Sequence, residues 1–220
     1  PQRLSQAFLP EGGQSPALAV IRERFREGAV LSGSSAGAMI VGRLTLCECG
    51  AGSSLHALLE HHLFEAPGFG LVPDEVLIDA HFFARGLLGR HVWEMARRDF
   101  HSGVGIDEAT AVVVPGDGGL WQVIGRGQVG LLRRPAGLPA GTLGDLAFSL
   151  LNPGDRFDPR TGQVAIAASR HPRPPAAARE QPTPFAQDIF APGAVPGLVQ
   201  FLARGLPATA GGTAAGGRIK

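Results

Sequence analysis

Hydrophobic positions in the first quarter of the chain follow a helical repeat and then a short continuous run. Ser15 precedes apolar residues at helical spacing and Gly28 follows them, which predicts a capped helix ending near Gly28. The apolar run at residues 29–31 predicts a buried strand, and the Ala- and Met-rich segment after residue 35 predicts another helix. Residues 44–49 predict a further strand. This order is typical of an α/β protein with a mostly parallel sheet flanked by helices.

The middle of the chain continues the alternation of strand and helix and then changes to consecutive strands. Residues 76–78 predict a short buried strand, and residues 83–100 predict a helix after it. Residues 110–114 and 120–124 flank a Pro/Gly/Asp-rich turn, which predicts a β-hairpin, and residues 128–132 predict a third strand. We therefore expect an antiparallel hairpin at the edge of the sheet.

Periodic patterns fade after residue 143. A Pro- and Ala-rich stretch covers residues 170–184, and residues 207–217 are nearly all Ala, Gly and Thr. Such segments have little apolar surface to bury, so we expect no regular structure in residues 207–217. We divide the chain into an α/β domain, residues 1–150, and a partly disordered Pro/Gly/Ala-rich extension, residues 151–220.

A G-x-S-x-G sequence follows the apolar run, as Gly33-Ser34-Ser35-Ala36-Gly37. This is the nucleophile-elbow pattern, in which glycines permit a tight turn that holds the central serine exposed. Ser35 is therefore the candidate nucleophile, and the Ala36 N–H at the start of the next helix is placed to bind an oxyanion. The alternative is an ordinary Ser/Gly turn. A phosphate-binding loop fits less well, because no Gly-Lys-Ser/Thr sequence follows.

A serine nucleophile needs a base that is itself oriented by an acid. His81 follows the short buried strand, with Asp79 two residues before it, and strand ends are where open α/β sheets bind ligands. We favour His81 as the base over the other histidines. The acid stays open: Glu48 is preferred to Glu60, and Glu65 and Asp79 are further candidates.

Composition narrows the classes of function. Lys and Arg number 20 and Asp and Glu 19 in 220 residues, so charge gives no case for nucleic acid or an anionic membrane as partner. Cys47 and Cys49 are too few for a disulfide framework, and with His61 and His62 they do not make a convincing metal site. No bilayer-length apolar run or signal segment is found, so we expect a cytoplasmic protein acting on a small molecule or a peptide.

Five motifs in this order resemble the cyanophycinase and aspartyl dipeptidase (peptidase E) family of serine peptidases. They are Gly33-Ser34-Ser35-Ala36-Gly37-Ala38, Gly68-Phe69-Gly70-Leu71, Asp79-Ala80-His81-Phe82, Arg85-Gly86 with Gly89-Arg90, and Gly105-Ile106-Asp107-Glu108-Ala109-Thr110-Ala111. The resemblance implies a fold like that of the class I glutamine amidotransferases. It also implies cleavage of a peptide or isopeptide bond on the carboxyl side of an aspartyl residue, without a metal or cofactor.

The resemblance also implies residue roles: Ser35 as nucleophile, His81 as base and Ala36 in the oxyanion hole. The implied substrate-pocket residues are Gln2, Asp79, Arg85 and Arg90. Arginines in such a pocket suit an acidic substrate, because a guanidinium binds a carboxylate through two N–H groups. A homodimer is expected only because enzymes commonly form one.

The sequence also departs from the family pattern. Ala80 and Leu87 stand where cyanophycinases usually have Gln and Arg, which leaves the nucleophile and base intact but bears on whether cyanophycin itself is a substrate. The family has sheet strands and a second oxyanion glycine upstream of the position of Gln2. We expect those parts to be missing if the chain begins at Pro1.

Two other functions fit parts of the sequence. An ordinary α/β-hydrolase-type esterase or amidase would pair Ser35 with a late histidine such as His171. A non-catalytic relative would keep the pocket and bind an acidic ligand through Arg85 and Arg90. Activity that survives His81→Ala but not His171→Ala would favour the first of these over the peptidase.

Overall fold

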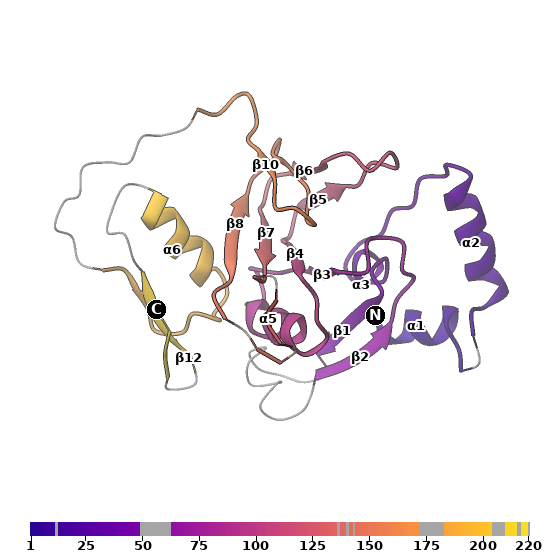
Figure 1. Cartoon of the computed structure of the whole chain (residues 1–220), viewed down its shortest axis with the longest axis horizontal. Coiled ribbons are helices and arrows are strands. Elements are labelled where there is room, and N and C mark those ends of the chain that lie inside the picture. Colours follow the sequence, from indigo (N-terminus) through magenta and orange to yellow (C-terminus); the bar gives the residue numbers. More distant parts are fainter. Residues whose placement is uncertain are drawn as a thin grey trace.

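The structure is a computed structural model that describes residues 1–11, 13–48, 63–135, 137–139, 141–142, 144–171, 183–203, 210–214 and 217–219. Its centre is a four-stranded sheet in the order β3-β4-β7-β8 (Figure 1). The strands are β3 (Val76–Ala80), β4 (Ser102–Ile106), β7 (Val129–Arg133) and β8 (Ala147–Leu151). The fold is thus α/β with mixed sheets.

The expectation of a mostly parallel sheet is wrong for the described strands. Only β3 and β4 pair in parallel within the central sheet, whereas β4 with β7 and β7 with β8 are antiparallel. Parallel neighbours need a long crossover, and here helix α5 (Leu88–Arg97) supplies one between β3 and β4. No described helix lies between β4 and β8, so the chain returns through antiparallel pairings.

The predicted hairpin forms, but in a separate sheet. Strands β5 (Thr110–Val113) and β6 (Trp121–Gly125) pair antiparallel and are extended by β9 (Arg156–Phe157) and β10 (Val164–Ala165). The predicted third strand is β7, which joins the central sheet instead. The division after residue 150 falls inside β8, and β9 pairs with β6 from the part of the chain before it. The two-domain division stays a prediction.

Two apolar layers sit on opposite sides of the central sheet. Leu77 of β3 faces a cluster that contains Phe82, Met95 and Leu132, with α5 on that side. Val76 and Ile78 face a second cluster with Trp121 and Phe157 from the β5-β6 sheet. Because both faces of β3 are covered, all five of its residues are buried. This rigid strand ends directly before His81.

The N-terminal part packs beside β1 (Leu44–Glu48) and β2 (Leu63–Pro67), which pair antiparallel (Figure 1). It contains α1 (Gln2–Phe8), which the sequence did not predict, and α2 (Pro16–Arg26). The predicted α2 is confirmed: the Ser15 side chain accepts a hydrogen bond from Leu18 N at 3.2 Å.

The strand predicted at residues 29–31 is wrong. This segment is irregular, and Val30 is 96% exposed. A strand needs a hydrogen-bonded neighbour, and among the described residues none pairs with this segment. The following helix, α3 (Ala36–Met39), does form after Ser35. The elbow is therefore held by its own turn and by α3 rather than by a sheet.

The helix predicted at residues 83–100 is shorter, because residues 81–87 form turns before α5. The C-terminal part contains β11 (Phe185–Ala186), α6 (Ala194–Ala203), β12 (Gly211–Ala214) and β13 (Gly217–Ile219). The expectation of no regular structure at residues 207–217 is therefore wrong for β12, since backbone pairing with β11 and β13 substitutes for side-chain packing. No helix in the described ranges has the length and hydropathy to span a bilayer.

Glu94 on α5 gives this fold a pH-dependent element. Its carboxylate is buried and accepts a hydrogen bond from Arg97 Nε at 2.7 Å. Burial raises the pKa of Glu94 to about 7, although Arg98 pulls it in the opposite direction. The folded state therefore holds a proton on Glu94 that the unfolded chain releases above its ordinary pKa of 4.5.

We expect the free energy of unfolding to fall as pH rises from about 4.5 to 7, through the contribution of Glu94. Substitution Glu94→Gln removes the titration, so the variant should lose less stability than the wild type across that window. Urea unfolding at pH 4.5, 6 and 8 measures this difference. Parallel pH profiles for the two proteins would rule out the role of Glu94.

Candidate active site

Three side chains meet at one edge of the central sheet. His81 Nε2 lies 2.9 Å from Ser35 Oγ, and His81 Nδ1 lies 3.1 Å from Glu108 Oε1. In the tautomer with the proton on Nδ1, His81 donates to Glu108 and accepts the proton of Ser35. This chain of contacts has the geometry of a nucleophile, a base and an orienting acid.

The backbone at these positions is held in the left-handed region. Ser35 has φ 52 and ψ −115, His81 has φ 58, and Ala109, directly after Glu108, has φ 52. A non-glycine residue in such a conformation costs on the order of 1–3 kcal/mol, so the surrounding structure must hold it there. Strain of this kind gathers at functional sites, and here it falls at or beside each of the three contacting residues.

The first glycine of the elbow has a steric reason to be glycine. A Cβ at Gly33 would lie 2.1 Å from the carbonyl oxygen of Gly37, which is too close for any side chain. A Cβ at Gly37 would meet nothing within 4 Å. The tight turn that exposes Ser35 therefore depends on Gly33, and the geometry predicted for the G-x-S-x-G sequence forms without a preceding strand.

Glu108 was missed by the sequence reasoning, although a signal for it was present. Strands β3 and β4 are parallel neighbours, and Ala80 of β3 pairs with Ile106 of β4. The residues that follow them, His81 and Glu108, therefore emerge at the same edge of the sheet. The acidic pair Asp107-Glu108, directly after the short run of Gly and apolar residues at 103–106, was the available clue.

Asp107 fixes the turn that carries His81. Its Oδ1 accepts hydrogen bonds from the backbone N–H groups of Phe83 at 3.1 Å and Ala84 at 2.9 Å. Phe82 N also donates to the carbonyl of Ile106 at 3.2 Å. The loops after β3 and β4 are thus tied together, which sets the distance between His81 and Glu108.

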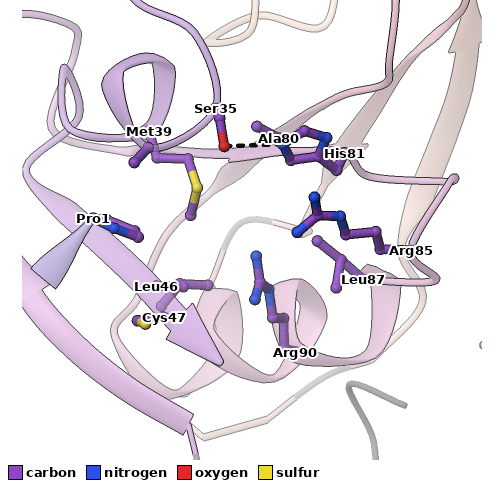
Figure 2. A pocket seen from close by; sticks show the side chains of 11 residues that line it. Pro1, Ser35, Met39, Leu46, Cys47, Ala80, His81, Arg85, Leu87 and Arg90 are labelled. Carbon is purple, nitrogen blue, oxygen red and sulfur yellow. Dashed lines mark hydrogen bonds between the residues drawn. The ribbon is translucent and has the colours of Figure 1, made fainter. Parts of the chain in front are cut away.

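A cavity of about 360 Å³ opens beside Ser35 and His81 (Figure 2). Two guanidinium groups reach into it: that of Arg90 from the side opposite Ser35, and that of Arg85 from the side of His81 (Figure 2). The other residues that line it are Pro1, Ala36, Met39, Leu46, Cys47, Ala80 and Leu87. Ser35 and His81 therefore face a space of suitable size for a small molecule or the end of a peptide.

Asp79 holds one of these arginines in place. Its two carboxylate oxygens accept from Arg90 Nε at 2.9 Å and Arg90 Nη2 at 2.6 Å, and Oδ1 also accepts from Ala80 N. Burial alone raises the pKa of Asp79, but the attraction of Arg90, aided by the nearby His91 ring, outweighs it and lowers the pKa to about 2. Asp79 is fully buried and does not line the cavity, so it positions Arg90 rather than facing the space itself.

Substitution Asp79→Asn should destabilise the fold by about 3 kcal/mol, because it leaves the charge of a buried Arg90 uncompensated. Asp79 has a lowered pKa, so its contribution is complete above the ordinary pKa of 3.8 and is lost as pH falls toward 2. Urea unfolding at pH 7 and pH 3 measures both effects. The exposed Asp145→Asn variant is the control, and an equal loss in the two variants would contradict the role of Asp79.

The other predicted residues are distributed as follows. Ala36 lies at the start of α3 and lines the cavity, whereas Gln2 lies in α1 and is not among the lining residues. Glu65 accepts from Arg98 Nε at 2.9 Å and is occupied away from His81. Glu60 and the side chain of Glu48, the preferred acid, lie outside the described residues; the carboxylate at His81 Nδ1 is Glu108.

Metal ligands do not gather in the described ranges, where no group of three or more His, Cys, Asp or Glu side chains is suited to hold an ion. Of the sequence candidates for such a site, only Cys47 falls in those ranges, and Cys49, His61 and His62 lie outside them. The polar groups that face the cavity are a hydroxyl, an imidazole, a thiol and two guanidinium groups. This donor set favours an anionic organic ligand.

Comparisons with known proteins single out one group of enzymes. A cyanophycinase from Trichormus variabilis is 36% identical over 174 residues, or 70% of this chain and 56% of that protein. Cyanophycinases from Synechococcus elongatus and Geminocystis herdmanii are 38% identical over 117 residues (53% of this chain, 35% of that protein) and 32% identical over 160 residues (68% and 57%).

This chain spans about half the length of the curated proteins that it resembles, so the match covers only part of each relative. The crystal structure of a peptidase from an acI-B1 actinobacterium has a TM-score of 0.41 and 24% identity, covering 65% of this chain and 51% of that one. No family model matches the chain.

Proposed function

The chain is a homologue of the cyanophycinases over the 174 matched residues, and from this we propose that it is a serine-type peptidase that hydrolyses aspartyl substrates. The observation that carries the proposal is the contact of His81 Nε2 with Ser35 Oγ at 2.9 Å, on an elbow that faces a cavity with two arginines. Peptide and β-aspartyl (isopeptide) compounds are the substrate class.

In the proposed reaction Ser35 Oγ attacks the scissile carbonyl while His81 Nε2 takes its proton. Glu108 stabilises the resulting imidazolium and holds the proton on His81 Nδ1 toward itself. The tetrahedral intermediate collapses when His81 gives its proton to the leaving amine. Water then repeats the sequence on the acyl-enzyme and releases the carboxylic acid.

The developing oxyanion lies beside the Ala36 N–H, the first amide after the nucleophile. The positive φ of Ser35 turns the backbone so that its side chain and the amide of the next residue can face the same ligand. Arg85 and Arg90 bind a substrate carboxylate, with Arg90 held by Asp79. This arrangement would orient an acidic substrate at Ser35.

The finer parts of the proposal follow from the family resemblance. A class I glutamine amidotransferase-like fold would supply further strands on the side of residues 29–31, which have no strand partner among the described residues. We retain Gln2 as a substrate contact and a homodimer as the assembly. The α/β-hydrolase alternative is not favoured, because the histidine in contact with Ser35 is His81 rather than His171.

Turnover of a small substrate panel tests the proposed function. The panel contains β-aspartyl-arginine, β-aspartyl-leucine, an α-aspartyl dipeptide and a p-nitrophenyl ester. We expect hydrolysis of at least one aspartyl compound. Cleavage of the ester alone would instead favour the esterase alternative, and cleavage of none by a folded chain would contradict the proposal.

A further inference from the structure

We propose that the segment at residues 189–196 positions Arg85, and that it thereby sets how tightly the site holds an acidic substrate. The inference rests on the proposed function, in which Arg85 binds a substrate carboxylate. It goes beyond that function because it gives a segment far along the chain a part in substrate binding.

This segment is attached to the turn that carries Arg85. Gly193 N donates to the carbonyl of Phe83 at 3.0 Å, and the same carbonyl accepts from Gly86 N at 3.2 Å, which closes the turn around Arg85. A carbonyl oxygen has two lone pairs, so it can accept both hydrogen bonds. The segment is therefore bound at the point where the turn closes.

Gly86 allows the two backbones to approach closely. It has φ 63 and is buried, although Arg85 before it is exposed. A Cβ at Gly86 would collide with the carbonyl oxygen of Phe190, so this position has no room for a side chain. Beside this contact, Val195 packs against the apolar cluster that contains Phe83. The backbone directly after Arg85 is therefore confined while the segment is in place.

The segment has supports of its own. Asp188 Oδ1 accepts from Phe190 N at 2.9 Å, and Ile189 N donates to the carbonyl of Thr213 in β12 at 2.9 Å. Helix α6 follows directly after Gly193. An element that is held in this way can restrain the turn rather than follow its movements.

The two ends of the turn have different supports. Asp107 Oδ1 holds the backbone N–H groups of Phe83 and Ala84, close to His81. The segment at residues 189–196 instead confines the glycine directly after Arg85. Loosening this segment should therefore weaken the binding of an acidic substrate and leave the nucleophile and the base in contact.

The experiment compares Val195→Gln with Phe201→Gln, which makes the same kind of change at an exposed position of α6. A fluorophosphonate labels Ser35 in each variant, and we measure the concentration of β-aspartyl-leucine that halves the labelling rate. This concentration should rise about fivefold in V195Q and stay unchanged in F201Q, because a mobile Arg85 must be ordered on binding. The labelling rate without dipeptide should be the same in both variants.

The same measurements in an Arg85→Gln background show whether the segment acts through Arg85. We expect V195Q to have no further effect there, because the interaction that it disturbs is already lost. A general loss of stability would instead weaken binding in both backgrounds. This comparison therefore separates a positioning role from a merely structural one.

The outcomes distinguish this inference from the proposed function. An unchanged concentration in V195Q, or a rise of equal size in the R85Q background, would overturn the positioning role and leave the proposed function standing. Slower labelling of V195Q without dipeptide would show that the segment supports His81, which also contradicts the inference. A wild-type protein whose Ser35 is labelled but is not protected by the dipeptide would overturn the aspartyl substrate class and this inference with it.

Discussion

Substitution Ser35→Ala should lower kcat/KM for an aspartyl substrate by roughly 10⁵- to 10⁶-fold. The loss is this large because Ser35 Oγ is the atom that forms the acyl-enzyme, and no other hydroxyl lies at 2.9 Å from His81 Nε2 in the described part of the chain. A small residual rate remains, since the cavity and the Ala36 N–H still orient substrate and stabilise charge.

Steady-state hydrolysis with an active-site-titrated wild-type reference measures this loss. Ser34→Ala is the matched control, because Ser34 is the adjacent exposed serine of the same turn, and its backbone carbonyl accepts a hydrogen bond from Gly37 N at 2.8 Å. An S35A protein that keeps more than about a hundredth of the wild-type kcat would show that another group is the nucleophile.

Substitution Glu108→Gln should lower kcat by about 10³-fold with little change in KM. The amide can present its N–H to His81 Nδ1, which favours the wrong tautomer and removes the charge that stabilises the imidazolium. We expect less than the roughly 10⁴-fold loss of a buried triad acid, because the Glu108 side chain is 57% exposed and water partly replaces its field.

Glu48→Gln distinguishes the two candidate acids. Glu48 was the residue preferred from the sequence, whereas Glu108 is the carboxylate that lies 3.1 Å from His81 Nδ1. We expect E48Q to retain the wild-type kcat and E108Q to lose it. The reverse pattern would show that Glu48 is the orienting acid and that the exposed contact of Glu108 with His81 does not contribute to catalysis.

Local patterns predicted the parts of the fold that depend on nearby residues. The cap of α2 by Ser15, the β5-β6 hairpin and strand β3 were each visible in spacing and turn chemistry. The family resemblance carried by the five motifs is confirmed by the cyanophycinase homologues. The contact of Ser35 with His81 joins residues 46 positions apart, and the motif order was enough to predict it as a pair.

Features that depend on distant pairing were not predictable in the same way. The apolar run around Val30 has the composition of a strand, but composition cannot supply the neighbouring strand that hydrogen bonding needs. Asp79 was expected to face a substrate, and only the position of Arg90 one helix later shows that it is buried beneath the cavity. Glu108 required knowing that β3 and β4 are parallel neighbours.

The turns that carry Ser35 and His81 are strained, and neighbouring elements hold them in place. Ser35 and His81 come from turns that carry backbone strain, but those turns are anchored to α3, to β3 and, through Asp107, to the loop after β4. Packing and hydrogen bonds around these turns thus offset the energetic cost of the left-handed φ angles. Of the two arginines that line the cavity, Arg85 is exposed and Arg90 is held by Asp79.

The most direct test of the Ser35-His81-Glu108 site is to treat the folded protein with a fluorophosphonate and locate the adduct by peptide mass spectrometry. We predict one adduct per chain, on the peptide that contains Ser35, absent in S35A and formed more slowly in E108Q. An adduct on a different residue, or none on the folded chain under conditions that label a known serine hydrolase, would contradict the assignment of Ser35 as the nucleophile.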